Sequence, residues 1–271
     1  MTQRNTLIFI TTLIAGLGVS NTALSETANE PNAPSFIITG PGYTTEFQGS
    51  NDYSIVPFIA SQFNVGKMRV DIEGLGSRVT LYNTGQWQAG PALALDLGRN
   101  EEVENAQIAK LDAVDSAAFL GGFIQKGIDN VVVKGDELTV STAVYHDVTD
   151  TGGGNYTQLS LSYAPPLMLP FRLDFSVDAT VADDDYMQTY FGVDTQNSAR
   201  SGLNAYQASA GLKDISLSTN IGLFVSPKWG AFARLSVTQL QGDAKDSPIT
   251  KAGRAQSYFA GLGLYYRFGA E

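Results

Sequence analysis

His146 is the only histidine of the chain and the first residue to weigh for chemistry. A hydrolase that used it as a general base would need a serine and an acid beside it. Asp147 is adjacent, but neighbouring residues of a strand point to opposite faces, and the sequence places no serine next to His146. We therefore interpret His146 as the end of a strand and expect no catalytic residue.

Two acidic runs and one glycine run could suggest ion or phosphate binding. Asp183-Asp184-Asp185 lacks the spaced ligands and closing carboxylate of a calcium loop, and Glu101-Glu102-x-Glu104 is equally typical of a solvated loop. Gly152-Gly153-Gly154 is not followed by the Lys-Ser/Thr of a phosphate loop. The sequence thus predicts no metal site and no cofactor.

Composition excludes several classes of function. The chain holds 17 Lys and Arg against 27 Asp and Glu, a net charge of -10, which argues against nucleic acid as a partner and against a polybasic membrane anchor. It has no cysteine, which excludes a disulfide, a thiolate nucleophile, a Cys-ligated zinc and a lipidated N-terminal cysteine.

The N-terminal segment has the pattern of a signal peptide. Arg4 precedes an apolar run from Leu7 to Val19, and Ala23-Leu24-Ser25 supplies small residues for cleavage. The run is shorter than the ~20 residues of a membrane-spanning helix. We expect a signal peptide at 1–25, a flexible leader at 26–34 and one domain at 35–271.

In that domain, apolar and polar residues alternate with the two-residue period of β-strands. From Phe171 to Val181, every second residue is apolar, and the residues between them are polar or charged. The segment from Tyr258 to Phe268 repeats this pattern. Such segments of about 10–13 residues exceed ordinary strands and suit a tilted crossing of a bilayer, which favours a membrane barrel over a soluble periplasmic β-sandwich.

We predict an all-β fold: a closed antiparallel transmembrane β-barrel of about twelve strands, within a range of roughly ten to fourteen. The third strand has a possible bend at Gly74-Leu75-Gly76. The predicted strands are 35–47, 53–63, 67–82, 86–97, 115–126, 137–147, 155–164, 171–181, 203–213, 215–225, 230–240 and 256–268.

Counting strands back from the C-terminus assigns each connection to an end of the barrel. It places 241–255 outside the cell and the long segment 183–202 at the periplasmic end, together with both termini. Long periplasmic connections are atypical of such barrels. We keep the placement as a hypothesis that impermeant labelling of an introduced cysteine at Asn197 would test.

Charged residues on the inner face of the predicted strands could line the lumen. They could bias ion traffic through a pore, or pair with one another in a narrow lumen, which we slightly favour because about twelve strands lie between filled barrels and open porins. These residues are Arg172, Asp174, Asp178, Arg234 and Arg267.

Three short motifs follow one another along the chain: Gly49-Ser50-Asn51-Asp52-Tyr53 with Pro57, Tyr186-Met187 with Tyr190-Phe191-Gly192, and Gly242-Asp243 with Asp246-Ser247-Pro248. In this order and spacing, they resemble the MipA/OmpV family of outer-membrane proteins. The resemblance covers most of the chain after the predicted signal peptide and ends on Tyr265-Tyr266-Arg267-Phe268. Family-motif positions of unknown role are Gly49, Ser50, Asp52, Tyr53, Pro57, Tyr186, Phe191, Gly192, Asp243, Asp246, Ser247 and Pro248.

The resemblance implies a location and a role. It implies an outer-membrane barrel in contact with lipid, acting as a non-catalytic scaffold for periplasmic murein hydrolases or synthases in a Gram-negative cell. Other members are described as porin-like or adhesive. The alternatives are therefore a porin-like channel for small solutes and a barrel lipid hydrolase built on His146.

Overall fold

In the computed structural model, residues 35–268 of the chain are described, and their strands form a single antiparallel sheet. The signal peptide and leader that we predict lie outside the described residues. The strands are β1 (Ser35–Thr45), β2 (Tyr53–Val65), β3 (Met68–Glu73), β4 (Gly76–Thr80), β5 (Tyr82–Asn83), β6 (Trp87–Asp96), β7 (Ala117–Asp129), β8 (Glu137–Asp147), β9 (Asn155–Ala164), β10 (Phe171–Ala182), β11 (Gly211–Phe224), β12 (Trp229–Leu240) and β13 (Gln256–Phe268).

The sheet closes on itself. β1 pairs with β13, from Ser35 opposite Phe268 onward, and β4 pairs with β6. The short strand β5 continues the line of β4 after Leu81 and pairs with the same neighbour, β6. The wall therefore has twelve strand positions plus this extra piece, which confirms the prediction of a closed antiparallel barrel of about twelve strands.

Two of the predicted strands are wrong, and the errors cancel in the count. The segment 67–82 is a hairpin, β3 and β4, which turns at Gly74-Leu75 with Gly74 in the left-handed region at a φ of 54°. The segment 203–210 is a connection. Its last three N–H groups donate to the side chains of Gln188, Asp243 and Asp184, so they are not available to a sheet.

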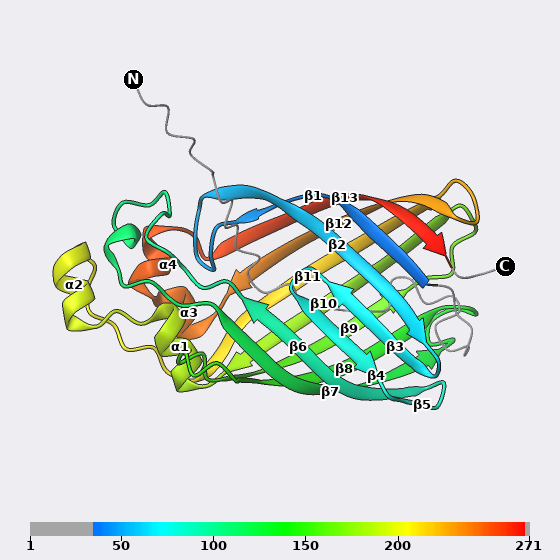
Figure 1. Ribbon diagram of the computed structural model, residues 1–271, viewed down its shortest axis with the longest axis horizontal. Helices are drawn as coiled ribbons and strands as arrows, with labels where there is room; N and C mark the ends of the chain where they lie inside the picture. The colour runs from blue at the N-terminus through cyan, green and yellow to red at the C-terminus, as the bar shows by residue number, and fades with distance from the viewer. Residues whose placement is uncertain (1–34, 269–271) are drawn as a thin grey trace, which may run out of the picture.

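The corrected strands change the topology. One end of the barrel, called the helical end, carries the connections 46–52, 97–116, 148–154, 183–210 and 241–255 (Figure 1). The opposite end, called the terminal end, carries Ser35, Phe268 and the short turns. The prediction that 183–202 and 241–255 lie at opposite ends is therefore wrong, because it counted a strand at 203–213 that does not form.

All helices of the described chain lie at the helical end (Figure 1). They are η1 (Ile108–Lys110), α1 (Asp184–Phe191), α2 (Thr195–Ser201), α3 (Gly242–Asp246) and α4 (Pro248–Ala252). None of the helices in residues 35–268 is long and apolar enough to cross a bilayer.

The outer wall is apolar because alternate residues of each strand point outward. On β13, Leu262 and Leu264 are 65% and 64% exposed, whereas Asp174 of β10 points inward and is 1% exposed. Exposed aromatic side chains gather near the terminal end, where Trp229 packs on Tyr266 with ring centroids 4.5 Å apart. An apolar belt with aromatic residues at its edge is typical of barrels that span lipid.

The inner wall is bulkier than the sequence suggests. We expect small or polar inward residues, but Phe58, Phe232 and Phe259 form an aromatic cluster inside the barrel. Gly261 leaves room for this cluster, because a Cβ there would lie 3.0 Å from the Phe58 and Phe259 rings. The glycines of β13 thus accommodate aromatic side chains in the lumen.

Candidate functional site

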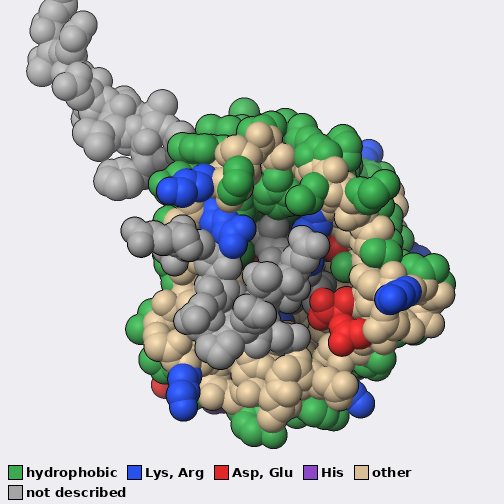
Figure 2. Space-filling view, turned by 90° about the vertical axis from the view of Figure 1, so that its right-hand side faces the viewer, with side chains coloured by type: hydrophobic (Ala, Val, Ile, Leu, Met, Phe, Trp, Pro, Cys, Tyr) green, Lys and Arg blue, Asp and Glu red, His purple; other side chains and the backbone are tan. Residues whose placement is uncertain are grey.

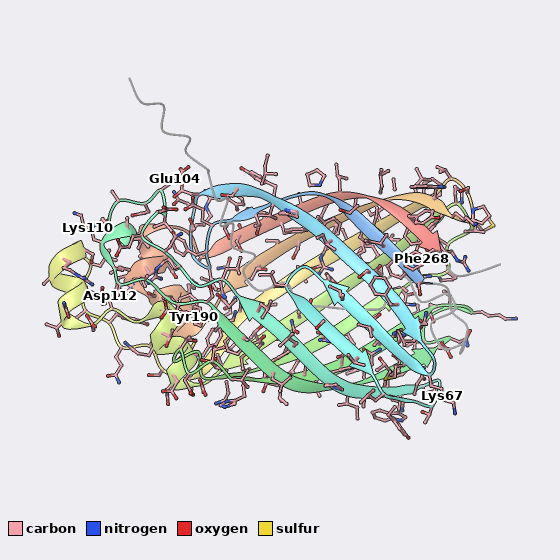
Figure 3. All side chains as sticks on the ribbon, viewed as in Figure 1. Lys67, Glu104, Lys110, Asp112, Tyr190 and Phe268 are labelled. Atoms are coloured by element: carbon pink, nitrogen blue, oxygen red, sulfur yellow. The ribbon has the colours of Figure 1, made fainter. Side chains whose placement is uncertain are left out.

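The helical end is capped by α1, which packs into the mouth of the barrel. Tyr186 packs against Phe119 and Tyr156 of the wall, with ring centroids 6.1 and 5.6 Å away. Lys213 of β11 places its ammonium 5.3 Å from the Tyr186 ring centre. Met187 and Phe191, on the same helix, are also buried in the adjoining core. These contacts hold α1 at the mouth of the barrel, where Figure 3 labels its residue Tyr190.

Most family-motif positions meet in this cap. Gln48, beside Gly49, donates to the Tyr186 hydroxyl at 3.1 Å, and the Ser247 hydroxyl donates to the carbonyl of Phe191 at 2.6 Å. The carbonyl of Gly49 accepts from Arg254 N–H at 2.8 Å. Three connections far apart in sequence are therefore joined through motif residues, and this convergence was not evident from their spacing.

The remaining motif residues shape local structure. Asp243 accepts from the N–H of Ser209 at 2.9 Å, and Ser50 accepts from the N–H of Asp52 at 3.0 Å. Ser247 caps α4, which starts at Pro248, and Gly192 ends α1. Two positions lie apart on β2: Tyr53, whose hydroxyl accepts from Tyr258 N–H at 3.2 Å, and the outward-facing Pro57. Asp246 is exposed, 3.7 Å from the Lys251 ammonium.

The acidic run at 183–185 builds the start of α1. Asp183 accepts from the N–H of Tyr186 at 2.9 Å, and Asp184 accepts from Ala210 at 2.6 Å. Burial alone would raise the pKa of Asp183, but hydrogen bonds from Tyr186 and Asn155 outweigh it and hold that pKa below its ordinary range. Residues 35–268 contain no cluster of three or more His, Cys, Asp or Glu suited to a metal ion.

His146 lies on the exposed side of β8. Its Nδ1 is 2.8 Å from the Asn155 side-chain oxygen, so its hydrogen bond goes to an amide. Asp147 points to the other face, where Thr149 and Thr151 donate to its carboxylate. Within residues 35–268, the structure therefore does not assemble a serine, histidine and acid around His146.

Charged side chains cross the middle of the lumen. Arg234 of β12 forms an ion pair with Glu73 of β3, although three other strands, β13, β1 and β2, lie between these two in the sheet. Arg69 pairs with Asp71 at 2.8 Å and donates to Gln88 at 2.7 Å. These interactions narrow the lumen with a polar network.

Two predicted lumen carboxylates belong to the same interior. Asp178 accepts from the Ser160 hydroxyl at 2.5 Å, and Asp174 accepts from the Asn220 amide at 2.8 Å. Arg78 is 1% exposed and lies over the Phe123 ring at 5.3 Å. We did not predict the network residues of β3 and β4, although the alternation of Arg69, Asp71 and Glu73 with apolar residues carried the signal. The four missed residues are Arg69, Asp71, Glu73 and Arg78.

The terminal end is hollowed by a vestibule of about 810 Å³. Its floor holds Phe36, Phe224 and Tyr265, with the Tyr265 ring 5.4 and 5.0 Å from the other two. Arg172 and Arg267 also line the vestibule. Arg267 has no ion-pair partner among the described residues.

Three acidic residues line the vestibule as well: Asp129, Asp136 and Glu137. Figure 2 looks onto this end, with hydrophobic side chains around the wall and acidic ones at the mouth. Its volume lies in the ~300–1,000 Å³ range of ligand pockets, and its charges sit around an aromatic floor. The vestibule is the most developed candidate binding site among the described residues.

The fold and cap can now be compared with known proteins. The family model described as "MltA-interacting protein MipA" matches residues 37–268. The chain belongs to the MipA family. No curated protein matches it.

Several solved outer-membrane barrels are similar to this MipA-family chain at low identity. A structure of the NanC porin is 10% identical, with a TM-score of 0.44, over 86% of this chain and 100% of that one. OprB of Pseudomonas putida is 12% identical, with a TM-score of 0.38, over 79% and 59%. OmpT of Vibrio cholerae, an outer membrane protein, is 7% identical, with a TM-score of 0.34, over 86% and 96%.

Proposed function

We propose that this MipA-family barrel sits in the outer membrane and acts as a non-catalytic interaction protein that docks a murein enzyme at its vestibule. The observation that carries the proposal is the difference between the two ends. The helical end is capped by α1, whereas the terminal end is hollow and lined by aromatic and charged side chains. A barrel of this form suits a binding role on one side of the membrane.

The membrane location is supported by the apolar outer wall and by the closed sheet. Pairing between neighbouring strands satisfies backbone polar groups that lipid could not satisfy. We expect the protein to fractionate with the outer membrane and to migrate differently on gels with and without boiling. Recovery as a soluble periplasmic protein would contradict the membrane location, although it would agree with the predicted processing after Ser25.

The docking role is supported by the name of the family, whose description is of an MltA-interacting protein. Outer-membrane barrels typically have both termini and their short turns in the periplasm, which is where murein enzymes work. A murein hydrolase of MltA type is therefore the partner to test first. Acidic groups on that partner would suit Arg267, which lines the vestibule and forms no ion pair within residues 35–268.

Crosslinked co-purification with such an enzyme tests this role. Arg267→Glu at the vestibule is expected to weaken binding by about tenfold or more, since about 1.4 kcal/mol of lost interaction corresponds to a factor of ten. Lys251→Glu makes the same charge change at the helical end and is expected to leave binding unchanged. Equal binding by wild type and both variants would contradict docking at the vestibule.

A channel for small solutes is the second candidate, favoured by the charged side chains of the lumen. Planar-bilayer conductance distinguishes it from the scaffold. The polar network and the cap of α1 lead us to expect conductance well below that of an open porin. A large, steady conductance of the wild-type protein would favour the channel instead.

A further inference from the structure

The barrel wall has a notch at the helical end, beside the hairpin of β3 and β4. These strands have only 6 and 5 residues and turn at Gly74-Leu75. β3 pairs with β2 from Ala60 to Val65, and Gly74 N–H donates to Ile59. From Ile59 toward the helical end, the segment Tyr53–Phe58 of β2 pairs with β1 on one edge. On its other edge, it has no neighbour among the described strands (Figure 1).

The backbone of β2 is adapted to this open edge. Alternate residues of a strand direct their N–H and C=O groups to the same side. Because the Ile59 carbonyl faces β3, the backbone groups of Pro57 and Ile55 face the notch. Proline has no N–H, so Pro57 removes one donor that lipid could not satisfy. The remaining groups of Ile55 need partners from whatever enters the notch.

A cavity of about 70 Å³ lies directly behind the hairpin turn. It touches Leu75 and Leu95 of the wall as well as Tyr156 and Lys213 of the interior. Leu95 is 43% exposed on the outer face, and its N–H donates to the carbonyl of Leu75 at 3.0 Å. The cavity therefore lies between the hairpin turn and the inward side chains, at the base of the notch.

The lining of the cavity defines the chemistry of a ligand. Lys213 is paired with Asp214 at 2.8 Å, Glu73 is paired with Arg234, and Asp96 accepts from Gly98 N–H at 2.7 Å. Because Lys213 is already paired and Asp96 is itself an anion held by a backbone N–H, an added anionic group would find no free counter-ion among these residues. The uncharged lining residues supply hydrogen-bonding groups: Gln48, Tyr156, Gln158, Thr180 and Tyr186.

Apolar side chains border the notch on the outside. Ile55 is 70% exposed, Ile59 is 40% exposed and Leu93 is 37% exposed on the wall of the barrel. We propose that the notch admits a single-chain amphiphile from the bilayer, with a small uncharged hydroxyl headgroup in the cavity and its acyl chain along these residues. The site rests on the proposed membrane location and is independent of the docking role.

Photo-crosslinking in lipid nanodiscs tests the site, with a diazirine-bearing monoacylglycerol as probe. We expect crosslinks to concentrate at the notch, around Leu75 and Leu95, and to be competed by unlabelled monoacylglycerol at least tenfold better than by oleate. Ala94→Phe, which fills the cavity, should reduce them severalfold. Ala231→Phe, on the outer face of β12, should not.

The outcomes distinguish a failure of the proposed membrane location from a failure of the proposed amphiphile site. Failure of the wild-type chain to enter nanodiscs would contradict the location. Entry with crosslinks spread evenly over outward residues such as Leu120 and Leu217 would overturn the site alone, as would equal competition by oleate. Should Ala94→Phe fail to show the heat-dependent gel shift of a folded barrel, the wild-type crosslink map and the two competitors still decide the question.

Discussion

At the scale of single residues, the ion pair of Arg234 and Glu73 joins two strands that are not neighbours in the sheet. Both side chains are buried, and removing one partner leaves an uncompensated charge. We expect Arg234→Ala to destabilise the barrel by about 3–5 kcal/mol. Chemical denaturation of the protein in detergent measures this change.

The matched control for that prediction removes both charges. Arg234→Met with Glu73→Leu should recover most of the lost stability, because well-packed apolar residues replace a buried pair at little cost. If the double variant is as unstable as Arg234→Ala, the loss comes from packing around Arg234 and not from an unpaired carboxylate.

Asp183 gives a second residue-scale prediction, which concerns pH. Its pKa is lowered in the folded protein, so its contribution to stability is present above its ordinary pKa and is lost as pH falls below about 4 toward the folded value. Asp183→Asn keeps an N-cap acceptor but does not titrate. We expect its stability to depend less on pH in that window, as followed by thermal unfolding; identical pH profiles would contradict this role.

At the scale of elements, α1 is the cap of the helical end. Tyr186 is its largest contact with the wall and with Lys213. Tyr186→Ala removes an aromatic ring from a packed site, a change that costs about 3–5 kcal/mol, and should loosen the helix in the mouth. We expect a severalfold rise in single-channel conductance, with more frequent openings.

The control for the cap is Tyr258→Ala, which removes the same side chain from the outer face, where Tyr258 is 46% exposed. Its conductance should equal that of the wild type. A silent Tyr186→Ala barrel would place the barrier to ions elsewhere, in the network of Arg69, Asp71 and Glu73.

Prediction of strands from the sequence succeeded where the alternation of apolar and polar residues continued over a long segment. β10 and β13 have the predicted alternation, with an apolar outer face. It failed at the hairpin of β3 and β4, because its strands also alternate and only the pair Gly74 and Gly76 marked the turn. It failed at 203–210, because side chains distant in sequence bind the backbone there, and local pattern does not reveal them.

At the scale of the whole molecule, the corrected topology predicts which end faces outward. Gln196, in α2 at the helical end, and Lys134, in a turn at the terminal end, are both exposed. The chain has no cysteine, so each can be replaced by one for labelling. We expect an impermeant reagent to label Gln196→Cys in intact cells and Lys134→Cys only after permeabilisation. The reverse pattern would invert the barrel and move the vestibule outside.

The candidate site was only partly predictable on this scale. The inward charges of Arg234, Asp174 and Asp178 followed from strand periodicity. The vestibule and the cap did not, because both depend on which loops share an end, and one false strand was enough to reverse that assignment. Contacts such as that of Ser247 with Phe191 span the fold and have no local signature in sequence.

The pairing of β1 with β13 has a consequence for how the protein is made. The seam joins the first described strand to the last, so its contacts have nearly the greatest sequence separation the chain allows. Contacts of this kind form late and slow folding. Until the final strand arrives, β1 and β13 are open edges that can pair with other chains. Assembly therefore depends on keeping the unfolded chain apart from its copies until the last strand has been made and can pair with the first.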